Sequence, residues 1–184
     1  MQNMSKAPSQ KNKNNDFKRV AVLGPPGSGK STFSLKIAEK TGLPVFHMDK
    51  YYLEKPEYWN EHHDEWHQFC LDLIDKDRWI IDGNYSATFE DKFKRADLIV
   101  YLDMGRLASY DGIIRRRIKY NNKKRPGMPD DWREKLNFGF MKFVWKFHGD
   151  ETQNIRILLE EHSHKDVKVF LSRQEANRYI ESIR

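Results

Sequence analysis

One eight-residue segment constrains the fold of this chain more than any other. It runs from Gly24 to Ser31, reads GPPGSGKS, and matches the pattern G-x-x-x-x-G-K-[ST] in full. The residues before it, Val20 to Leu23, form a short apolar run, which is typical of a strand buried on both faces. A helical pattern follows from about Ser31 and stops at Gly42. The segment is therefore predicted to join a buried strand to a helix.

The residue types in this segment suit phosphate binding. Glycines let backbone N–H groups point at one centre and let a phosphate approach closely. The start of the following helix adds a positive end. Lys30 is expected to reach the β- and γ-phosphates of a nucleotide, and Ser31 to offer its hydroxyl to Mg²⁺. The predicted nucleotide-binding residues are Gly24, Gly27, Ser28, Gly29, Lys30, Ser31 and Thr32.

Apolar runs and helical patterns alternate along the rest of the chain. Such alternation predicts an α/β fold with a parallel sheet that helices cover on both sides. In sheets of this type, ligands bind at the carboxyl ends of the strands. Further strands are predicted at 44–48, 79–82, 98–102 and 167–171, with helices near 61–76, 107–120, 136–147 and 155–159 and at the end of the chain.

Two carboxylates follow predicted strands. Asp82 ends the third strand, which is the position of an aspartate that holds Mg²⁺ directly or through water. Asp49 ends the second predicted strand, and three roles are open to it. It could accept a proton from a substrate hydroxyl, bind Mg²⁺ or orient the substrate. The residues after it, Lys50, Tyr51 and Tyr52, could line an acceptor pocket.

A basic segment follows the fourth predicted strand. Residues 115–125 hold seven positive charges and no acid. Such a segment suits a lid, predicted at about 106–150, that closes over phosphates, because arginine matches the charge on a transferring phosphoryl group. At least one of Arg115, Arg116 and Arg117 is expected to make that catalytic contact. A nucleic-acid surface is the competing interpretation.

Several side chains are predicted to be buried because of their helical spacing. In the helix at 107–120, the inward positions are Leu107, Tyr110, Ile114 and Ile118. In the next helix, the inward aromatic residues are Phe140, Phe143 and Phe147. The single cysteine, Cys70, falls among apolar residues of a helical pattern and is predicted to be an inert, buried thiol.

Length and composition set the remaining expectations. The 184 residues suit one α/β domain, predicted at 17–184, and the polar residues 1–16 are predicted to be a disordered tail. The 33 Lys and Arg against 27 Asp and Glu give a net charge of +6, which favours anionic partners. No apolar run approaches the ~20 residues of a membrane span. One cysteine allows no intrachain disulfide, so we expect a cytoplasmic protein with no membrane partner.

Four segments together resemble a known family. In order, they are the GPPGSGKS loop, HMDKY from His47, IIDGNYS from Ile80, and the arginine-rich stretch. Over roughly residues 18–183 the chain resembles the bacterial topology-modulation proteins, a branch of the adenylate-kinase-like P-loop kinases. The resemblance implies a three-layer P-loop NTPase fold, with a five-stranded parallel sheet in the order 2-3-1-4-5, helices on both faces and a helical lid after strand 4. It also implies ATP or a related nucleotide, with Mg²⁺.

One departure from the adenylate kinases concerns the phosphate acceptor. In those enzymes the Asp-Gly of the third strand is followed by Phe-Pro-Arg, whose arginine grips the acceptor phosphate. Here Asp82-Gly83 is followed by Asn84-Tyr85-Ser86, which argues against AMP as the acceptor. The segment from Asp49 to Tyr52 looks more like the acceptor site of uridine-kinase-like enzymes. A hydroxyl acceptor on a nucleoside or small metabolite is therefore open.

These features predict a small-molecule phosphotransferase that uses ATP and Mg²⁺. Its acceptor would be a nucleotide, a nucleoside or a similar small molecule. The alternative is a nucleotide-binding regulator that contacts DNA through its basic lid and tail and affects DNA topology. The sequence leaves both the acceptor and the oligomeric state open.

Overall fold

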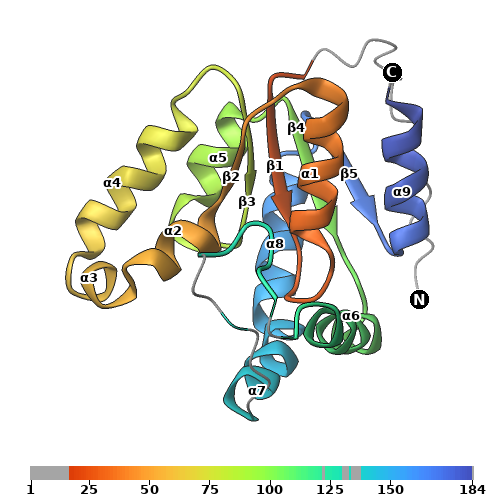
Figure 1. Cartoon of the computed structure of the whole chain (residues 1–184). Coiled ribbons are helices and arrows are strands. Elements are labelled where there is room, and N and C mark those ends of the chain that lie inside the picture. Colours follow the sequence, from red (N-terminus) through yellow and green to blue (C-terminus); the bar gives the residue numbers. More distant parts are fainter. Residues whose placement is uncertain (1–16, 122, 130–132, 134–137, 184) are drawn as a thin grey trace.

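The computed structural model describes residues 17–121, 123–129, 133 and 138–183. Five strands form one sheet in which every neighbouring pair is parallel, in the order β2-β3-β1-β4-β5 (Figure 1). This confirms the predicted α/β class and strand order. The predicted tail, residues 1–16, lies outside the described residues. The strands are β1 (Arg19–Leu23), β2 (Val45–His47), β3 (Trp79–Asp82), β4 (Leu98–Leu102) and β5 (Asp166–Phe170).

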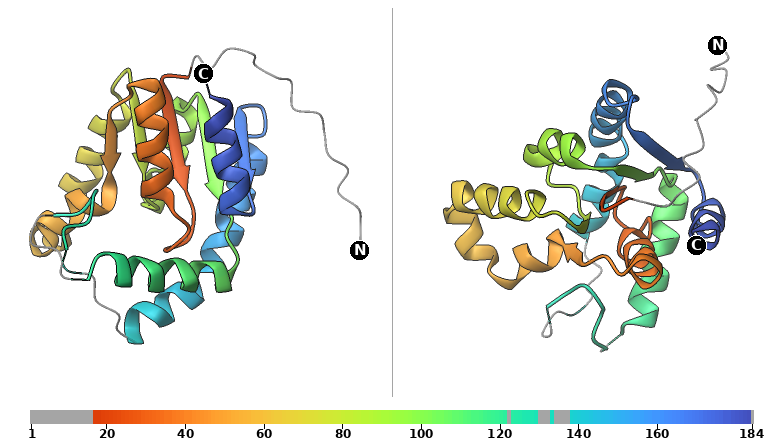
Figure 2. Two further views of the ribbon diagram at one scale, coloured as in Figure 1. Left: turned by 45° about the vertical axis from the view of Figure 1, so that its right-hand side comes forward. Right: turned by 90° about the horizontal axis from the view of Figure 1, so that it is seen from above.

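Helices cover both faces of the sheet, as Figure 2 shows from above. One core cluster joins the sheet to α4 (His63–Ile74), α5 (Phe89–Arg95) and α8 (Asp150–Glu161). A second cluster joins the other face to α1 (Lys30–Thr41) and α9 (Arg173–Ser182). The molecule therefore has the three layers that the sequence predicted.

The apolar run before the glycine-rich segment, which forms β1, buries side chains on both faces of the sheet. Side chains alternate along a strand, so successive residues of β1 face opposite layers. Val20 and Val22 pack in the cluster with α1 and α9, whereas Ala21 and Leu23 pack in the cluster with α4 and α5. All four are fully buried. Leu23 ends β1 at the carboxyl edge of the sheet, where the glycine-rich loop begins.

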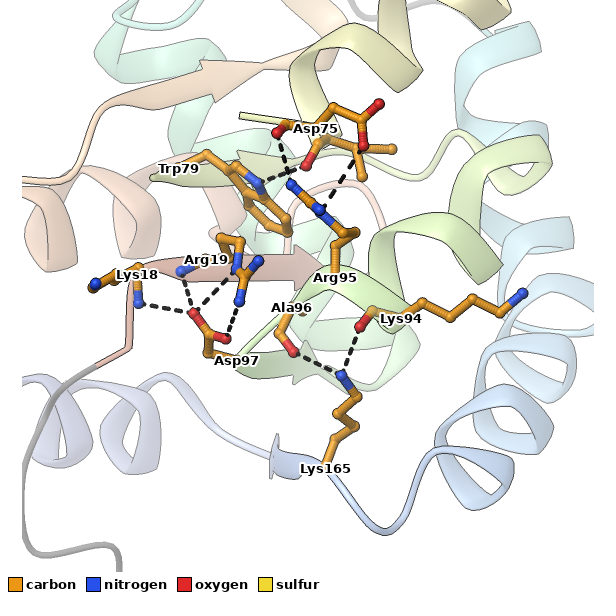
Figure 3. Close-up of polar contacts among 10 residues, drawn as sticks. Lys18, Arg19, Asp75, Trp79, Lys94, Arg95, Ala96, Asp97 and Lys165 are labelled. Carbon is orange, nitrogen blue, oxygen red and sulfur yellow. Dashed lines mark hydrogen bonds and ion pairs between the residues drawn. The ribbon is translucent and has the colours of Figure 1, made fainter. Parts of the chain in front are cut away.

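The opposite, amino edge of the sheet is closed by polar contacts (Figure 3). Asp97 precedes β4, and its Oδ2 accepts the backbone N–H groups of Lys18 and Arg19, each at 3.0 Å. The Arg19 guanidinium also donates to Asp97, with Nη2 2.8 Å from Oδ1. Lys165 Nζ donates to the backbone carbonyls of Lys94 and Ala96. These contacts tie the starts of neighbouring strands together.

Short helices fill the path from β2 to α4. The first is α2 (Met48–Glu54), which begins directly after β2, and the second is α3 (Pro56–Glu61). Asp49 therefore lies in the first turn of a helix, and the prediction that it ends a strand is wrong. A short 3₁₀ helix, η1 (Ser86–Thr88), follows β3. Cys70 is buried on α4 as predicted, and burial raises the pKa of its thiol to about 12.

The helix after β4, α6 (Arg106–Lys119), packs by a different face from the predicted one. Its buried residues are Ser109 and Ile113. Leu107 is 87% exposed and Ile118 72% exposed, and Ile114 is exposed as well, so the predicted inward positions are wrong there. The face of α6 that packs against the protein is therefore the one that carries Ser109 and Ile113, and the face that carries Leu107 and Ile118 lies in solvent.

The next helix, α7 (Phe138–Phe147), bears out the predicted aromatic core only in part. Phe147 is buried in the cluster with α8, but Phe143 is exposed.

Within the described ranges, no helix combines the length and the apolar character that crossing a membrane requires.

Candidate active site

A large cleft opens at the carboxyl edge of the sheet. Its volume is about 1630 Å³. The glycine-rich loop of residues 24–31, which we name the phosphate loop after its predicted ligand, contributes to the lining together with α2, α4, α6 and the segment after α6. Most of the predicted site residues lie in this lining: Gly27, Ser28, Gly29, Lys30, Ser31, Thr32, Asp49, Arg115 and Arg116. Asp82 is buried at the end of β3, and Gly24 begins the loop. The fold therefore brings together residues that are far apart in the sequence.

The phosphate loop is pressed against α6 at one glycine. Gly27 has φ of 81°, in the left-handed region that favours glycine. A Cβ at this position would lie 2.2 Å from the backbone oxygen of Ser109. On the side of α6, a Cβ at Gly112 would lie 2.1 Å from the backbone oxygen of Gly27. This close approach explains why α6 packs by the face that carries Ser109, Gly112 and Ile113.

Lys30 lies at the centre of the charged groups of the site. Its Nζ donates to the carbonyl oxygens of Gly24 at 2.7 Å and Pro25 at 3.1 Å. Burial lowers the pKa of Lys30 from its ordinary value. The attraction of two carboxylates, Asp49 and Asp82, raises this pKa, whereas the repulsion of two arginines, Arg116 and Arg125, lowers it. Both carboxylates and both arginines therefore act electrostatically on the same ammonium group.

Asn84 holds the start of the phosphate loop. Its Oδ1 accepts the N–H of Gly24 at 3.2 Å, and its Nδ2 donates to the carbonyl oxygen of Gly24 at 2.6 Å. Sequence reasoning treated Asn84 only as a replacement for the Phe of the adenylate kinases. The signal that could have found its role is the pairing of β1 with β3, which places the residues after these strands side by side.

Arg173, at the start of α9, joins the phosphate loop to α6. Its Nη2 donates to the carbonyl oxygens of Gly27 at 3.1 Å and Ala108 at 2.7 Å. Its Nη1 donates to Asp111 Oδ2 at 3.0 Å. Nothing in the local sequence indicated this role, because the four residues meet only in the folded chain.

The carboxylate of Asp82 is held by a histidine. His47 Nδ1 lies 2.9 Å from Oδ1 and 3.0 Å from Oδ2 of Asp82, and both side chains are buried. The segment after α6 reaches the same place, because a Cβ at Gly127 would lie 2.8 Å from Cδ2 of His47. Gly127, two residues after the basic segment, therefore lies against His47 at the end of β2.

The oxygen ligands of the site fit Mg²⁺. This ion prefers hard oxygen donors and usually binds one or two carboxylates, with phosphate and water completing its shell. Ser31 supplies a hydroxyl, and Asp82 and Asp49 supply carboxylates whose charges reach Lys30. In the described part of the chain, no group of three or more His, Cys, Asp or Glu is arranged to hold a metal ion. Ser31 and Asp82 are the residues that would hold Mg²⁺ together with a nucleotide.

The structure distinguishes the three candidate arginines of α6. Arg116 lines the cleft and acts electrostatically on Lys30. Arg115 also lines the cleft, but its side chain is exposed and its Nε donates to Asp111 Oδ1 at 2.7 Å. Arg117 donates to Asn121, one helical turn further along. Arg116 therefore combines a place in the cleft lining with an electrostatic effect on Lys30.

A buried lysine lies beneath the site. Lys92 of α5 is fully buried, and its Nζ donates to the carbonyl oxygen of Gly83 at 3.2 Å and lies 5.4 Å from the centre of the Phe89 ring. Burial lowers the pKa of Lys92 to about 8. Its bond supports the turn between Asp82 and Asn84. The sequence analysis assigned no role to Lys92.

The comparisons with known proteins agree with this architecture. A shikimate kinase from Bacteroides thetaiotaomicron is 18% identical, with a TM-score of 0.51 over 90% of this chain and 95% of its own. A sugar kinase from Janibacter sp. is 16% identical, with a TM-score of 0.52 over 89% and 90%. A shikimate kinase from Acinetobacter baumannii, in complex with shikimate, is 14% identical, with a TM-score of 0.50 over 90% and 92%. At such identities the likeness establishes the P-loop kinase fold. No protein-family model and no curated protein matches the sequence.

Proposed function

We propose that the protein is a kinase that transfers the γ-phosphoryl group of ATP, with Mg²⁺, to a hydroxyl group of a small molecule. The observation that carries this proposal is that Lys30, Asp49 and two arginines, Arg116 and Arg125, line one cleft at the phosphate loop. The charges of these residues and of Asp82 act on the Lys30 ammonium group. Cations there suit the nucleotide phosphates, and carboxylates suit the metal ion and the acceptor hydroxyl. The P-loop kinase fold supports the same activity.

Each group has a role in the transfer. The acceptor oxygen forms a bond to the γ-phosphorus while the bond from that phosphorus to the bridging oxygen breaks, and ADP leaves with the electron pair. Asp49 takes the hydroxyl proton, and Lys30 and Arg116 stabilise the charge on the transferring group. Bound Mg²⁺ supplies neutralisation of the phosphate charge. Asn84 and Arg173 keep the loop in place through Gly24 and Gly27.

The resemblance to the topology-modulation branch is part of this proposal. It is supported by the IIDGNYS segment, since Asp82 lies at the end of β3 and Asn84 contacts the phosphate loop. ATP as the donor is likewise supported by the complete GPPGSGKS loop.

The proposal is tested by an ATP-consumption screen with nucleosides, nucleoside monophosphates and sugar-like alcohols as acceptors. In the variant Asp49→Asn, turnover should fall by about 10²-fold or more, because the carboxylate that takes the proton is lost. Affinity for ATP should change little. The matched control is Glu54→Gln, which removes another carboxylate of α2 that pairs with Lys50. No ATP consumption with any acceptor, or equal turnover in the two variants, would contradict the proposal.

A further inference from the structure

One part of the cleft wall differs in chemistry from the rest. It is formed by α2, α4 and the turn after β3, which lie together at one side of the sheet (Figure 1). The described lining residues from these elements include one carboxylate and no lysine or arginine. The described cationic lining residues come from the other elements of the cleft. The polar and aromatic residues on this side are Asp49, Tyr52, His63, Trp66, Asn84 and Tyr85.

Three of these residues, Tyr52, Trp66 and Tyr85, form what we name the aromatic wall. The ring centres of Tyr52 and Trp66 are 5.4 Å apart with planes at 71°, and those of Trp66 and Tyr85 are 5.7 Å apart with planes at 63°. Such edge-to-face contacts fix the orientation of rings. Trp59 and Phe69 pack behind Trp66, with ring centres at 5.3 and 5.7 Å. The rings are therefore braced against one another. Trp66 is buried, and the half-buried rings of Tyr52 and Tyr85 form the accessible part of the wall.

The aromatic wall and the proposed base belong to one rigid unit. Asp49 and Tyr52 are three residues apart on α2, so their side chains lie on the same face of the helix. Both line the cleft, and Asp49 also acts on Lys30 at the phosphate loop. A molecule whose ring rests on this wall would thus be held beside the carboxylate that faces the phosphates.

Two polar side chains on this side, Asn84 and Tyr52, are engaged in contacts within the protein. Both polar atoms of the Asn84 side chain bond to Gly24, and the Tyr52 hydroxyl donates to Asn60. An aliphatic polyol needs many hydrogen-bond partners when it leaves water. A phosphate monoester needs cations, which this side lacks among its described lining residues. The rings of the aromatic wall offer a planar ring a larger matching surface than they offer either of these acceptors.

We propose that the aromatic wall binds the planar ring of an uncharged acceptor, so that the substrate is a nucleoside whose hydroxyl points to Asp49. Stacking of a base on aromatic side chains provides binding energy without charge. The inference rests on the proposed function for the transfer step. In that step the nucleoside oxygen gains the phosphoryl group, and its proton passes to the Asp49 carboxylate.

The experiment measures binding without ATP, by equilibrium dialysis of the full chain. The probes are uridine, adenosine, uridine 5′-monophosphate and glucose. The nucleosides should bind about tenfold or more tightly than the monophosphate and the sugar, because only they combine a ring with no charge. Equal retention of all four probes, or tighter binding of the monophosphate than of uridine, would overturn the inference.

Two leucine variants locate the binding surface. Tyr85→Leu should weaken nucleoside binding about tenfold, since it removes a ring that lines the cleft. Tyr58→Leu, which removes an exposed ring of α3, should change it less than about twofold. An equal response of the two variants overturns the proposal. If Tyr85→Leu does not fold, Tyr52→Leu tests the same wall.

The dialysis and turnover measurements distinguish a failure of the inference from a failure of the proposed function. If nucleosides bind but no ATP is consumed with them or with any other acceptor, the proposed function is wrong and the aromatic wall stands. If ATP is consumed with glucose and nucleosides do not bind, the proposed function stands and the inference about the wall is wrong.

Discussion

The two edges of the sheet carry charged residues of similar types but use them differently. At the amino edge, Asp97 accepts from Arg19 and from two backbone N–H groups, and Lys165 donates to two carbonyls. At the carboxyl edge, two carboxylates and two arginines act on Lys30 within a cleft. The first arrangement lowers the free energy of the folded chain. The second gathers charge where a ligand can bind. Lys92 is buried beneath it, and burial of its charged form disfavours folding.

The largest expected effect is the loss of turnover in the variant Lys30→Ala, at the carboxyl edge. Turnover of ATP should fall by about 10³-fold or more, because the helix end alone cannot replace a cation aimed at the phosphates. The melting temperature should change little, since only two hydrogen bonds to loop carbonyls are lost. Turnover assays and thermal melting of one sample give both quantities. Unchanged turnover in a folded variant would refute the role of the phosphate loop.

The buried charge of Lys92 is expected to lower the free energy of unfolding, and the dependence of stability on pH tests this expectation. Its pKa falls from 10.5 to about 8 in the folded chain, so between these values the unfolded chain binds more protons. Stability therefore rises with pH across this window, by about 3 kcal/mol for this one group. Below about pH 8 the full cost of the buried charge is present.

The variant Lys92→Met should lose this part of the pH dependence. Urea denaturation at several pH values from 7 to 10.5 measures it as the difference from the natural chain. The control is Lys94→Met, which removes an exposed lysine of the same helix. Parallel stability curves for the natural chain and Lys92→Met would show that Lys92 keeps its ordinary pKa.

A smaller effect should separate the arginines of α6. Arg116→Gln should lower turnover by about 10²-fold, because it removes a cation that shares the cleft with Lys30. Arg117→Gln should be nearly silent, since that side chain bonds to Asn121. Duplex-DNA affinity measured on the same variants addresses the alternative function. Small, equal losses of DNA affinity with no loss of turnover would favour a DNA-binding regulator.

The smallest effect is expected from a substitution at the amino edge, which should change stability and leave turnover unchanged. Asp97→Asn should lower the free energy of unfolding by about 1–2 kcal/mol, because it weakens the charged bonds from Arg19. Burial raises the pKa of Asp97, but the bonds from Arg19 and Lys18 outweigh it and hold the pKa below its ordinary value. The difference between the two chains should therefore shrink as pH falls through that lowered pKa. A loss of turnover at unchanged stability would contradict this division between the edges.

Local patterns were sufficient for the presence of the five strands and of the longer helices, but not for α2, α3 or α5. The apolar runs predicted the strands, because a strand buried on both faces must be apolar throughout. The glycine-rich loop with Lys30 and Ser31 could be identified because its chemistry depends on neighbours in the sequence. Asp82 was placed correctly for the same reason, at the end of an apolar run.

Contacts between segments that are distant in the sequence could not be predicted from local patterns. The bond of Asn84 to Gly24 depends on the pairing of β1 with β3, and the bonds of Arg173 depend on the packing of α9 beside α6. The packing face of α6 was misjudged because Leu107, Ile114 and Ile118 were taken as the inward residues, whereas the face that approaches Gly27 carries Ser109, Gly112 and Ile113. Spacing along the chain therefore determines which residues share an element and a face. Which face meets a neighbour, and which charge is buried, is decided by the steric fit of the whole fold.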